Sequence, residues 1–283
     1  MNTNKILVSV IVLTYGQVRY IKQAINSILE QKTNFVYEII VGEDCSPDGT
    51  KDILKQYEKM HPQKFVMLYR EQNLGINQNL VDALRRARGA YVAFCEGDDY
   101  WLDDNKLQRQ VEFLIANSEY IAVAHNCQVV DRLGTNAQDI SYFLCTEEEY
   151  SFKHYLQNIH PGQSATLVFK NYFNKHPEDL KLLELANPPD RMLCFLLRSR
   201  GRIRVFRNKM SAYRYVDTGN ENWTARLINS KGFEVASLEQ YKLMLLHAKK
   251  YFANNKDITF CAEKNFLCMH FLCLFIIDLL GMN

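Results

Sequence analysis

Short apolar runs and amphipathic segments alternate through the first hundred residues of the chain. The runs are rich in Val, Ile and aromatic residues, which is typical of strands buried on both faces of a sheet. They lie at residues 6–13, 37–41, 65–68 and 90–95. The segments between them carry apolar residues at helical spacing, at residues 19–31, 51–60 and 77–88, and Gly89 is expected to end the third helix. This alternation predicts an α/β fold with a doubly wound, mostly parallel sheet flanked by helices.

The second half of the chain mixes the two kinds of element. Helices are predicted at residues 106–117, 151–158 and 192–200, and strands at residues 120–130, 165–169 and 202–205. Residues 134–149 show no period and predict a solvated loop. Residues 198–214 hold seven basic residues and no acid. That segment is either a solvated basic face or a patch that attracts a diphosphate or anionic lipid head groups.

A helical tail is predicted from residue 237 onward. Its last part, residues 266–280, is apolar except for His270 and Asp278. At 1.5 Å per residue this stretch is about 22 Å long, short of the ~30 Å needed to span a bilayer. It is expected either to pack on the domain or to lie on a membrane surface.

The fourth apolar run stops at three carboxylates within four residues. Glu96 and Asp98 flank Gly97, and Asp99 follows. In open α/β sheets, ligands bind outside the carboxyl ends of the strands, and Gly97 lets the backbone approach whatever the acids hold. Grouped hard oxygen ligands suit Mn²⁺ or Mg²⁺, which bind through one or two carboxylates plus substrate phosphates. The alternative is an acidic turn that is only solvated.

The common phosphate-binding glycine loops do not occur in the sequence. The turn after the first strand has a single glycine, Gly16, and neither G-x-G-x-x-G nor G-x-x-x-x-G-K-[ST] is found. A dinucleotide-dependent dehydrogenase and a P-loop NTPase are therefore not expected. A metal ion held by Glu96 and Asp98 is the remaining way to neutralise a nucleotide diphosphate in such a sheet.

A second candidate acid follows two prolines. Asp190 comes after Pro188 and Pro189, at the start of the helix that Gly201 is expected to end. Such an acid can simply cap the helix. A carboxylate at a rigid helix start is also well placed to act as a general base.

Composition narrows the class of protein. The chain has 283 residues, 47% of them hydrophobic and 23% charged, which is ordinary for a globular protein. The net charge of +2 gives no argument for nucleic-acid binding. Eight cysteines are scattered without a Cys-x-x-Cys pair, as expected of free thiols in a reducing compartment. With no signal peptide apparent, a cytoplasmic protein is predicted.

Four motifs together resemble family 2 glycosyltransferases, inverting enzymes with the GT-A fold. They are VSVIVLTY at residues 8–15, GEDCSPDGT at residues 42–50, NLG at residues 73–75 with Asn79, and RGAYVAFCEGDD at residues 88–99. The resemblance covers about residues 5 to 225. It divides the chain into a nucleotide-sugar-binding half (1–105), an acceptor-binding half (106–225) and a C-terminal helical tail (226–283).

The resemblance implies roles for residues of the first half. Asp44 would accept a hydrogen bond from uracil or another base, and Asp98 would bind the metal with Glu96 beside it. The residues implied to bind the nucleotide-sugar are Thr14, Tyr15, Asp44, Asn79, Arg88, Glu96, Gly97 and Asp98. For Arg88, placed by the resemblance near the donor phosphates, a cation favoured at a helix C-terminus is an equal alternative.

In the second half, the resemblance makes Asp190 the base that deprotonates the acceptor hydroxyl. Candidates for the acceptor side are His160, Arg214 and Trp223. The family's Tyr-Arg pair is usually followed two residues later by a histidine, and Val216 stands there. A third metal ligand from the protein is therefore in doubt.

Taken together, the sequence predicts a metal-dependent inverting glycosyltransferase. It would move a sugar from a nucleoside diphosphate, most simply a UDP-sugar, to a hydroxyl of a glycan or lipid-linked acceptor in cell-surface polysaccharide synthesis. The enzyme would work at the inner membrane face, with a possible peripheral contact through residues 266–280. The alternatives are a sugar nucleotidyltransferase and a non-catalytic nucleotide-sugar-binding protein.

Overall fold

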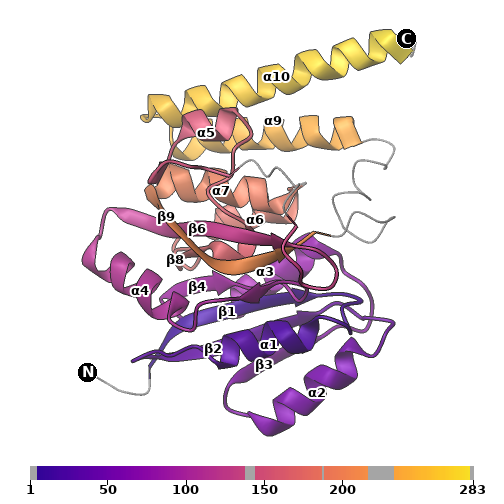
Figure 1. Cartoon of the computed structure of the whole chain (residues 1–283). Helices are drawn as coiled ribbons and strands as arrows, with labels where there is room; N and C mark the ends of the chain where they lie inside the picture. Colours follow the sequence, from indigo (N-terminus) through magenta and orange to yellow (C-terminus); the bar gives the residue numbers. More distant parts are fainter. Residues whose placement is uncertain (1–4, 138–143, 187, 216–232, 281–283) are drawn as a thin grey trace.

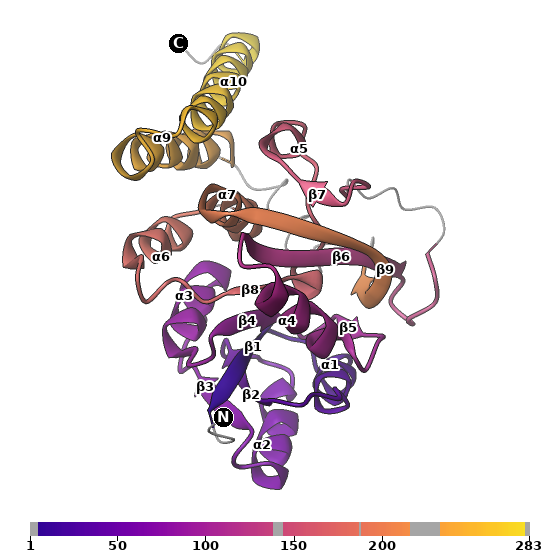
Figure 2. The ribbon, with the colours of Figure 1, turned by 90° about the vertical axis from the view of Figure 1, so that its left-hand side faces the viewer.

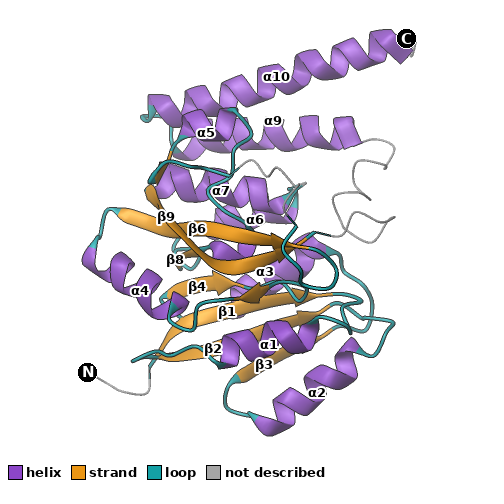
Figure 3. Cartoon of the chain, viewed as in Figure 1, coloured by secondary structure: helices purple, strands orange, loops and turns teal. Residues whose placement is uncertain are grey.

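A mixed β-sheet runs through the molecule, and helices cover both of its faces (Figure 1, Figure 3). The computed structural model describes residues 5–137, 144–186, 188–215 and 233–280. Within these residues the sheet has nine strands, eight of them in the order β3-β2-β1-β4-β8-β6-β9-β5, with β7 paired to β9. The predicted α/β sheet flanked by helices, with helices at the C-terminal end, is confirmed.

The first half of the sheet is parallel. Its strands are β1 (Ile6–Thr14), β2 (Val36–Glu43), β3 (Phe65–Tyr69) and β4 (Tyr91–Phe94). β1 lies between β2 and β4, and all three pairings in this half are parallel. The carboxyl ends of these strands therefore meet at one edge of the sheet, which is where the conserved geometry of open α/β folds places ligands.

The second half of the sheet changes direction at β8. β8 (Val168–Lys170) lies antiparallel between β4 and β6 (Tyr120–Val130), and β6 pairs parallel with β9 (Arg202–Arg214). Two short strands, β5 (Tyr100–Trp101) and β7 (Glu149–Tyr150), pair antiparallel with β9. The pairing of β5 brings the end of β9 next to the acids that follow β4.

Alternate residues of β1 divide the core into two clusters. Val8, Val10 and Val12 pack with α1 (Ile21–Leu29), α2 (Thr50–Met60) and α4 (Lys106–Ala116) on one face. Ile11 belongs to the other cluster, which includes α3 (Ile76–Arg86), α6 (Pro177–Glu184) and α7 (Pro189–Arg200). Figure 2 shows α1 and α3 on opposite sides of β1 and β4.

A further layer of helices lies on the outer side of α7 (Figure 2). It contains α5 (Phe152–Leu156), α9 (Phe233–Tyr251) and α10 (Lys256–Leu280). Met244 of α9 and Ile258 and Cys261 of α10 are buried in the same cluster as α7. The described beginning of the tail is thus docked on the domain. The side chains of residues 269–280 lie outside the described residues, and no described helix is long and apolar enough to cross a membrane.

Local differences from the sequence prediction have clear causes. α3 ends at Arg86, and Gly89 does not cap it: a Cβ on Gly89 would lie 2.5 Å from the Ser9 backbone N, so this glycine lets the start of β4 approach β1. The predicted strand at 165–169 begins as a short 3-10 helix, η1 (Ser164–Thr166), before β8. Helix α6 and the two-residue strands β5 and β7 were not predicted.

Candidate active site

The loops after β1, β2 and β4 come together at the carboxyl edge of the sheet. Beyond the paired strands, the Cys95 and Gly97 N–H groups donate to the Ile11 and Leu13 carbonyls, both at 3.0 Å. On the other side of β1, the Asp44 N–H donates to the Thr14 carbonyl at 3.1 Å. These bonds extend the parallel ladder past the strand ends and fix both acidic loops against β1.

Gly97 is required by close packing of the acidic loop. A Cβ on this residue would lie 2.2 Å from Gln17 Oε1 and 2.8 Å from Thr14 Oγ1. Among the described residues, neither oxygen has a hydrogen-bond partner although both are buried, and the same holds for Asp99 Oδ2. Buried polar atoms are normally satisfied, so the close packing around Gly97 leaves an unusual group of unpaired oxygens at this loop.

Three carboxylates converge at this edge. Burial, together with repulsion from Asp98 and then Asp190, raises the pKa of Glu96 to about 8, and a hydrogen bond with Ser164 opposes this rise. The effect of Asp190 matters because Asp190 lies on α7, far away in sequence. Burial also raises the pKa of Asp98, against hydrogen bonding from Gln17 and the positive charge of Arg214. The folded chain therefore gathers more negative charge here than it neutralises.

Arg214 supports the acidic loop from beneath. Its N–H donates to Asp99 Oδ1 at 2.9 Å, and its Nε donates to the Asp98 carbonyl at 3.0 Å. The guanidinium also lies 4.4 Å from the ring centroid of Tyr20 and bonds to Gln23 Oε1. The expectation that Arg214 faces the acceptor is therefore corrected: it is buried by the donor loop, and it positions the acids.

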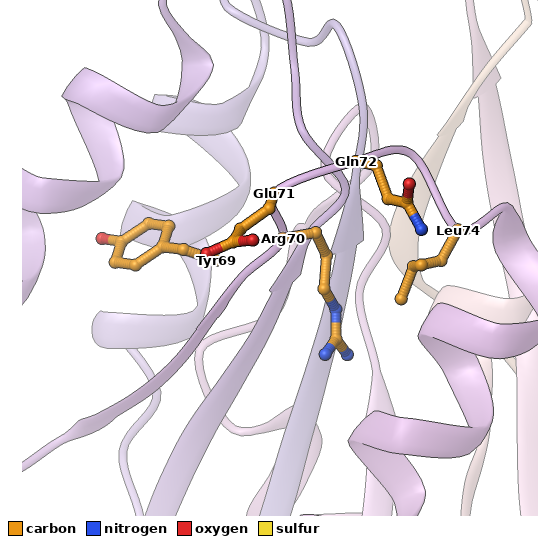
Figure 4. A pocket seen from close by; sticks show the side chains of 5 residues that line it. All are labelled: Tyr69, Arg70, Glu71, Gln72 and Leu74. Carbon is orange, nitrogen blue, oxygen red and sulfur yellow. The ribbon is translucent and has the colours of Figure 1, made fainter.

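Asp44 closes the neighbouring loop. Its two carboxylate oxygens accept the Leu74 N–H at 2.8 Å and the Gly75 N–H at 3.0 Å. Beside this loop lies an open pocket of about 680 Å³ (Figure 4). It is lined by Tyr69, Arg70, Glu71, Gln72 and Leu74. Thr14 is the last residue of β1, on the other side of Asp44, and the exposed Tyr15 follows it.

Arg88 and Asn79 were both expected to bind the nucleotide-sugar. Arg88 precedes β4 at the opposite edge of the sheet, where its Nε donates to Glu38 Oε2 at 2.9 Å, so its expected place near the donor phosphates is wrong. Asn79 is buried on α3, and its Nδ2 donates to the Gly42 carbonyl at 2.9 Å. Asn79 thus supports the end of β2 from inside, and its contact with the donor stays a prediction.

Asp190 is the second residue of α7. The N-cap is Pro188 and Pro189 is the first helical residue, so the alternative in which Asp190 caps the helix is wrong. The Arg191 N–H donates to Asp190 Oδ1 at 2.6 Å. His160 lies near Asp190: burial lowers the pKa of His160, and the negative charge of Asp190 opposes this. Trp223 and Val216 lie outside the described residues.

The basic segment is mostly engaged within the chain. Arg200 pairs with the buried Asp179 at 2.9 Å, and Arg204 pairs with Glu148 at 2.8 Å. Arg202 pairs with Glu149 in the same way. Asp179 lies on α6, Glu149 is the first residue of β7, and Glu148 precedes it. Because these arginines are paired with carboxylates, most of the basic segment is not available as the anion-attracting patch considered from the sequence.

The donor set at the acidic loop fits a divalent cation. Glu96 and Asp98 offer hard carboxylate oxygens in a place with unneutralised negative charge. Among the described residues, no three His, Cys, Asp or Glu side chains are grouped as a metal site. A two-carboxylate site completed by substrate phosphates is the arrangement expected for Mg²⁺ or Mn²⁺.

Sequence reasoning missed several residues of this region. Gln17 and Ser164, which hydrogen-bond Asp98 and Glu96, belong to no motif that we singled out. Arg191 was overlooked because its role depends on helices distant in sequence. Ser164 lies four residues after His160, a candidate acceptor-side residue, and that nearness was the available signal for it.

The family comparison covers the first half of this site. The model described as Glycosyl transferase family 2 matches residues 9–176, a range that includes Asp44, Glu96 and Asp98 and ends before Asp190. The putative teichuronic acid biosynthesis glycosyltransferase TuaG of Bacillus subtilis is 43% identical over 118 residues. That segment is 42% of this chain and 46% of TuaG. Proteins of Mycobacterium bovis and Mycobacterium tuberculosis are 38% identical over 122 residues. Those residues are 43% of this chain and only 35% of the mycobacterial proteins, so the match spans a small part of these relatives.

Solved structures share the fold over most of the chain. TarS 1-349 of S. aureus, solved in complex with UDP-GlcNAc, superposes with a TM-score of 0.69 at 22% identity. The match covers 94% of this chain and 73% of that one. The mannosyltransferase PcManGT of Pyrobaculum calidifontis, solved with GDP-Man and Mn²⁺, has a TM-score of 0.51 at 19% identity, over 92% and 69% of the two chains.

Proposed function

The chain belongs to glycosyl transferase family 2, and on that premise we propose that it transfers a sugar, with inversion, from a nucleoside diphosphate to an acceptor hydroxyl. The observation that carries the proposal is the meeting of Glu96, Asp98 and Asp190 at the carboxyl edge of the sheet. An inverting transfer needs a base on one side of the anomeric carbon and stabilisation of the leaving diphosphate on the other.

The donor is proposed to be a UDP-sugar. Asp44 holds Leu74, which lines the 680 Å³ pocket, and its two oxygens each accept one backbone N–H. Each carboxylate oxygen can accept a second hydrogen bond, so Asp44 can still receive an N–H from a base. Two structural neighbours were solved with UDP-GlcNAc and with GDP-Man, which supports a nucleotide-sugar and leaves UDP as the first donor to test.

Glu96 and Asp98 are proposed to hold a divalent metal, Mn²⁺ or Mg²⁺. When bound, such an ion would stabilise negative charge on the departing diphosphate. The chain itself supplies the rigidity of the site: Arg214 fixes Asp98 and Asp99, Gly97 brings the loop against β1, and Gln17 orients Asp98.

Asp190 is proposed as the general base. The Arg191 N–H fixes one of its oxygens, and the other, which bonds to none of the described residues, would accept the proton of the attacking hydroxyl. The acceptor is proposed to be a glycan or a lipid-linked glycan, because TuaG is named for teichuronic acid biosynthesis. Work at the inner membrane face, with contact through residues 266–280, is part of the same proposal.

The test is thermal stabilisation by the donor and its dependence on the acids. UDP-GlcNAc, or another UDP-sugar, should raise the melting temperature of the full chain when Mn²⁺ or Mg²⁺ is present and not when EDTA replaces it. Asp98→Ala should keep the fold and lose this metal-dependent shift. A normal shift in a folded Asp98→Ala protein would rule out its assigned role.

A further inference from the structure

Arg191 connects the proposed base to the C-terminal helices. Its backbone N–H donates to Asp190 Oδ1 at 2.6 Å. Its guanidinium lies 4.3 Å from the ring centroid of Tyr155, on α5. One residue therefore contacts the carboxylate through its main chain and the outer layer of helices through its guanidinium.

The guanidinium is held by four acceptors from three helical segments. They are the Tyr241 hydroxyl of α9 (from Nε, 3.0 Å), Asn265 Oδ1 of α10 (from Nη2, 3.2 Å), the Tyr155 carbonyl of α5 (from Nη2, 3.1 Å) and Asn158 Oδ1 just after α5 (from Nη1). Tyr241 and Asn265 are both buried. Asn265 is fixed in turn, because its Nδ2 donates to the Cys261 carbonyl at 2.9 Å.

Capping gives no restraint at the start of α7. Its N-cap, Pro188, makes no side-chain capping bond, and Pro189 has no N–H to give. The body of the helix is held by packing, since Met192 and Leu193 are buried in the core. The planar, five-donor guanidinium of Arg191 adds a directional restraint at the first turn, next to Asp190, in a geometry that a lysine could not reproduce.

We propose that Arg191 is a positioning residue for Asp190, and that α9 and α10 are a necessary part of the active site because Tyr241 and Asn265 hold it. This inference rests on the proposed function, in which Asp190 is the base. It gives the C-terminal helices, which lie beyond the family match at residues 9–176, a role in turnover.

The test uses small changes to the partners of Arg191 in the full chain. Tyr241→Phe and Asn265→Ala each remove one acceptor and leave Asp190 intact. Each should lower the rate of UDP release from UDP-GlcNAc by about ten-fold, because small errors in the placement of a catalytic group are costly. The affinity for UDP should not change, since Asp44 and Asp98 are untouched. Arg191→Lys should retain more activity than Arg191→Met.

A matched control loosens the same helix at another place. His247 of α9 bonds to Asp179, which pairs with Arg200 at the far end of α7. His247→Gln should lower the melting temperature as the Tyr241 and Asn265 variants do, and leave the rate unchanged. Equal losses of rate in all three variants would mean that the helices act through general stability, which would overturn the proposal.

A double-mutant cycle separates the proposed role of Arg191 from the proposed role of Asp190 as the base. With Asp190→Asn in place, Tyr241→Phe should reduce the residual rate no further, because the group that it positions is already disabled. If Asp190→Asn alone transfers at the normal rate, the proposed base is wrong. If Asp190→Asn is inactive while Tyr241→Phe and Asn265→Ala work normally, only the inference about Arg191 is overturned.

Discussion

The carboxylates of Glu96, Asp98 and Asp190 repel one another at one edge of the sheet. Burial raises the pKa of Asp98, and the positive charge of Arg214, which bonds to the same loop, opposes this rise. Burial and the charges of Asp98 and Asp190 raise the pKa of Glu96 to about 8. A ligand that brings a cation to this edge would relieve the repulsion and return Glu96 to its ionised form.

The role of Asp190 can be tested by one substitution. Asp190→Asn keeps the size of the side chain but cannot take a proton, so transfer should fall by roughly 10²–10⁴-fold with little change in donor affinity. The stability cost should be small, about 0.3–1 kcal/mol, because a carboxylate in the first turn interacts favourably with the helix dipole. Transfer rate, donor affinity and melting temperature are measured together. A stable variant with more than about a tenth of the normal rate would send the search for the base to His160.

Asp44 should affect both stability and binding. Asp44→Ala would leave the Leu74 and Gly75 N–H groups without their partner, which should cost roughly 1–3 kcal/mol of unfolding free energy. Nucleotide affinity should fall as well, by a similar amount, while metal binding stays unchanged. Calorimetry with UDP on the folded variant decides between the two roles. Unchanged affinity would leave Asp44 as the residue that closes the turn.

At the scale of elements, the hydrophobic patterns predicted the strands that are apolar along their own length. They missed the strands that form only because they pair with a distant segment. β1, β2 and β4 appear where the apolar runs lie because those strands are buried on both faces, and β3, at the edge of the sheet, is partly buried on both. The two-residue strands β5 and β7 carry no pattern of their own, since their pairing with β9 is what makes them strands. Gly89 was misread because a helix-ending glycine and a glycine of close approach look alike in sequence.

The same limit applies to the site. Glu96, Asp98 and Asp44 could be predicted because they follow buried strands, and the chain order of a parallel sheet places strand ends together. Arg214 and Arg191 could not be assigned, because their contacts join segments more than thirty residues apart, as the bonds from Arg214 to Asp99 and from Arg191 to Asn265 show. Arg88 was misplaced because it belongs to the same motif as Glu96 and Asp98. It precedes the strand, however, whereas the acids follow it, so Arg88 and the acids lie at opposite edges of the sheet.

Helix α4 begins with a buried charge that offers a pH-dependent test. Lys106 is fully buried, and its Nζ lies 4.2 Å from the Trp101 ring centroid and has no hydrogen-bond partner among the described residues. Burial lowers the pKa of Lys106 to about 7, below the value of about 10.4 in an unfolded chain. Between these values the unfolded chain binds more protons, so the contribution of Lys106 to stability rises as pH rises.

Lys106→Met should therefore stabilise the protein at neutral pH, by roughly 1–3 kcal/mol. The gain should shrink as pH rises from about 7 to about 10, because wild-type Lys106 becomes neutral in both states. Urea unfolding of both proteins at two pH values in this window measures the difference. A variant that is less stable than wild type at pH 7 would show that the contact of the ammonium with Trp101 outweighs the cost of burial.

At the scale of the whole molecule, the C-terminal helices are part of the core. Ile258, Cys261 and Ala262 of α10 are buried against the same cluster as α7, and Asn265 reaches Arg191. Removal of residues 258–283 should therefore lower stability by several kcal/mol and expose apolar surface.

Removal of residues 269–283 alone leaves all of those described contacts and is the matched comparison. The shorter deletion should keep the melting temperature within a few degrees of wild type. If residues 266–280 contact a membrane, it should also lose co-sedimentation with anionic vesicles. Equal melting temperatures for both deletions would contradict the docking of α10 on the domain, and absence of vesicle binding by the intact chain would remove the membrane contact.

The most direct test of the whole account is the fate of the sugar. The full chain is incubated with an α-linked UDP-sugar, such as UDP-GlcNAc, Mn²⁺ and a glycan acceptor, and the products are followed by NMR. The account predicts UDP and a β-linked product, with both lost in Asp190→Asn. Release of pyrophosphate would instead indicate a nucleotidyltransferase, and an α-linked product would contradict inversion. Tight, metal-dependent donor binding without any turnover across donors and acceptors would mean that the chain binds nucleotide-sugars and does not transfer them.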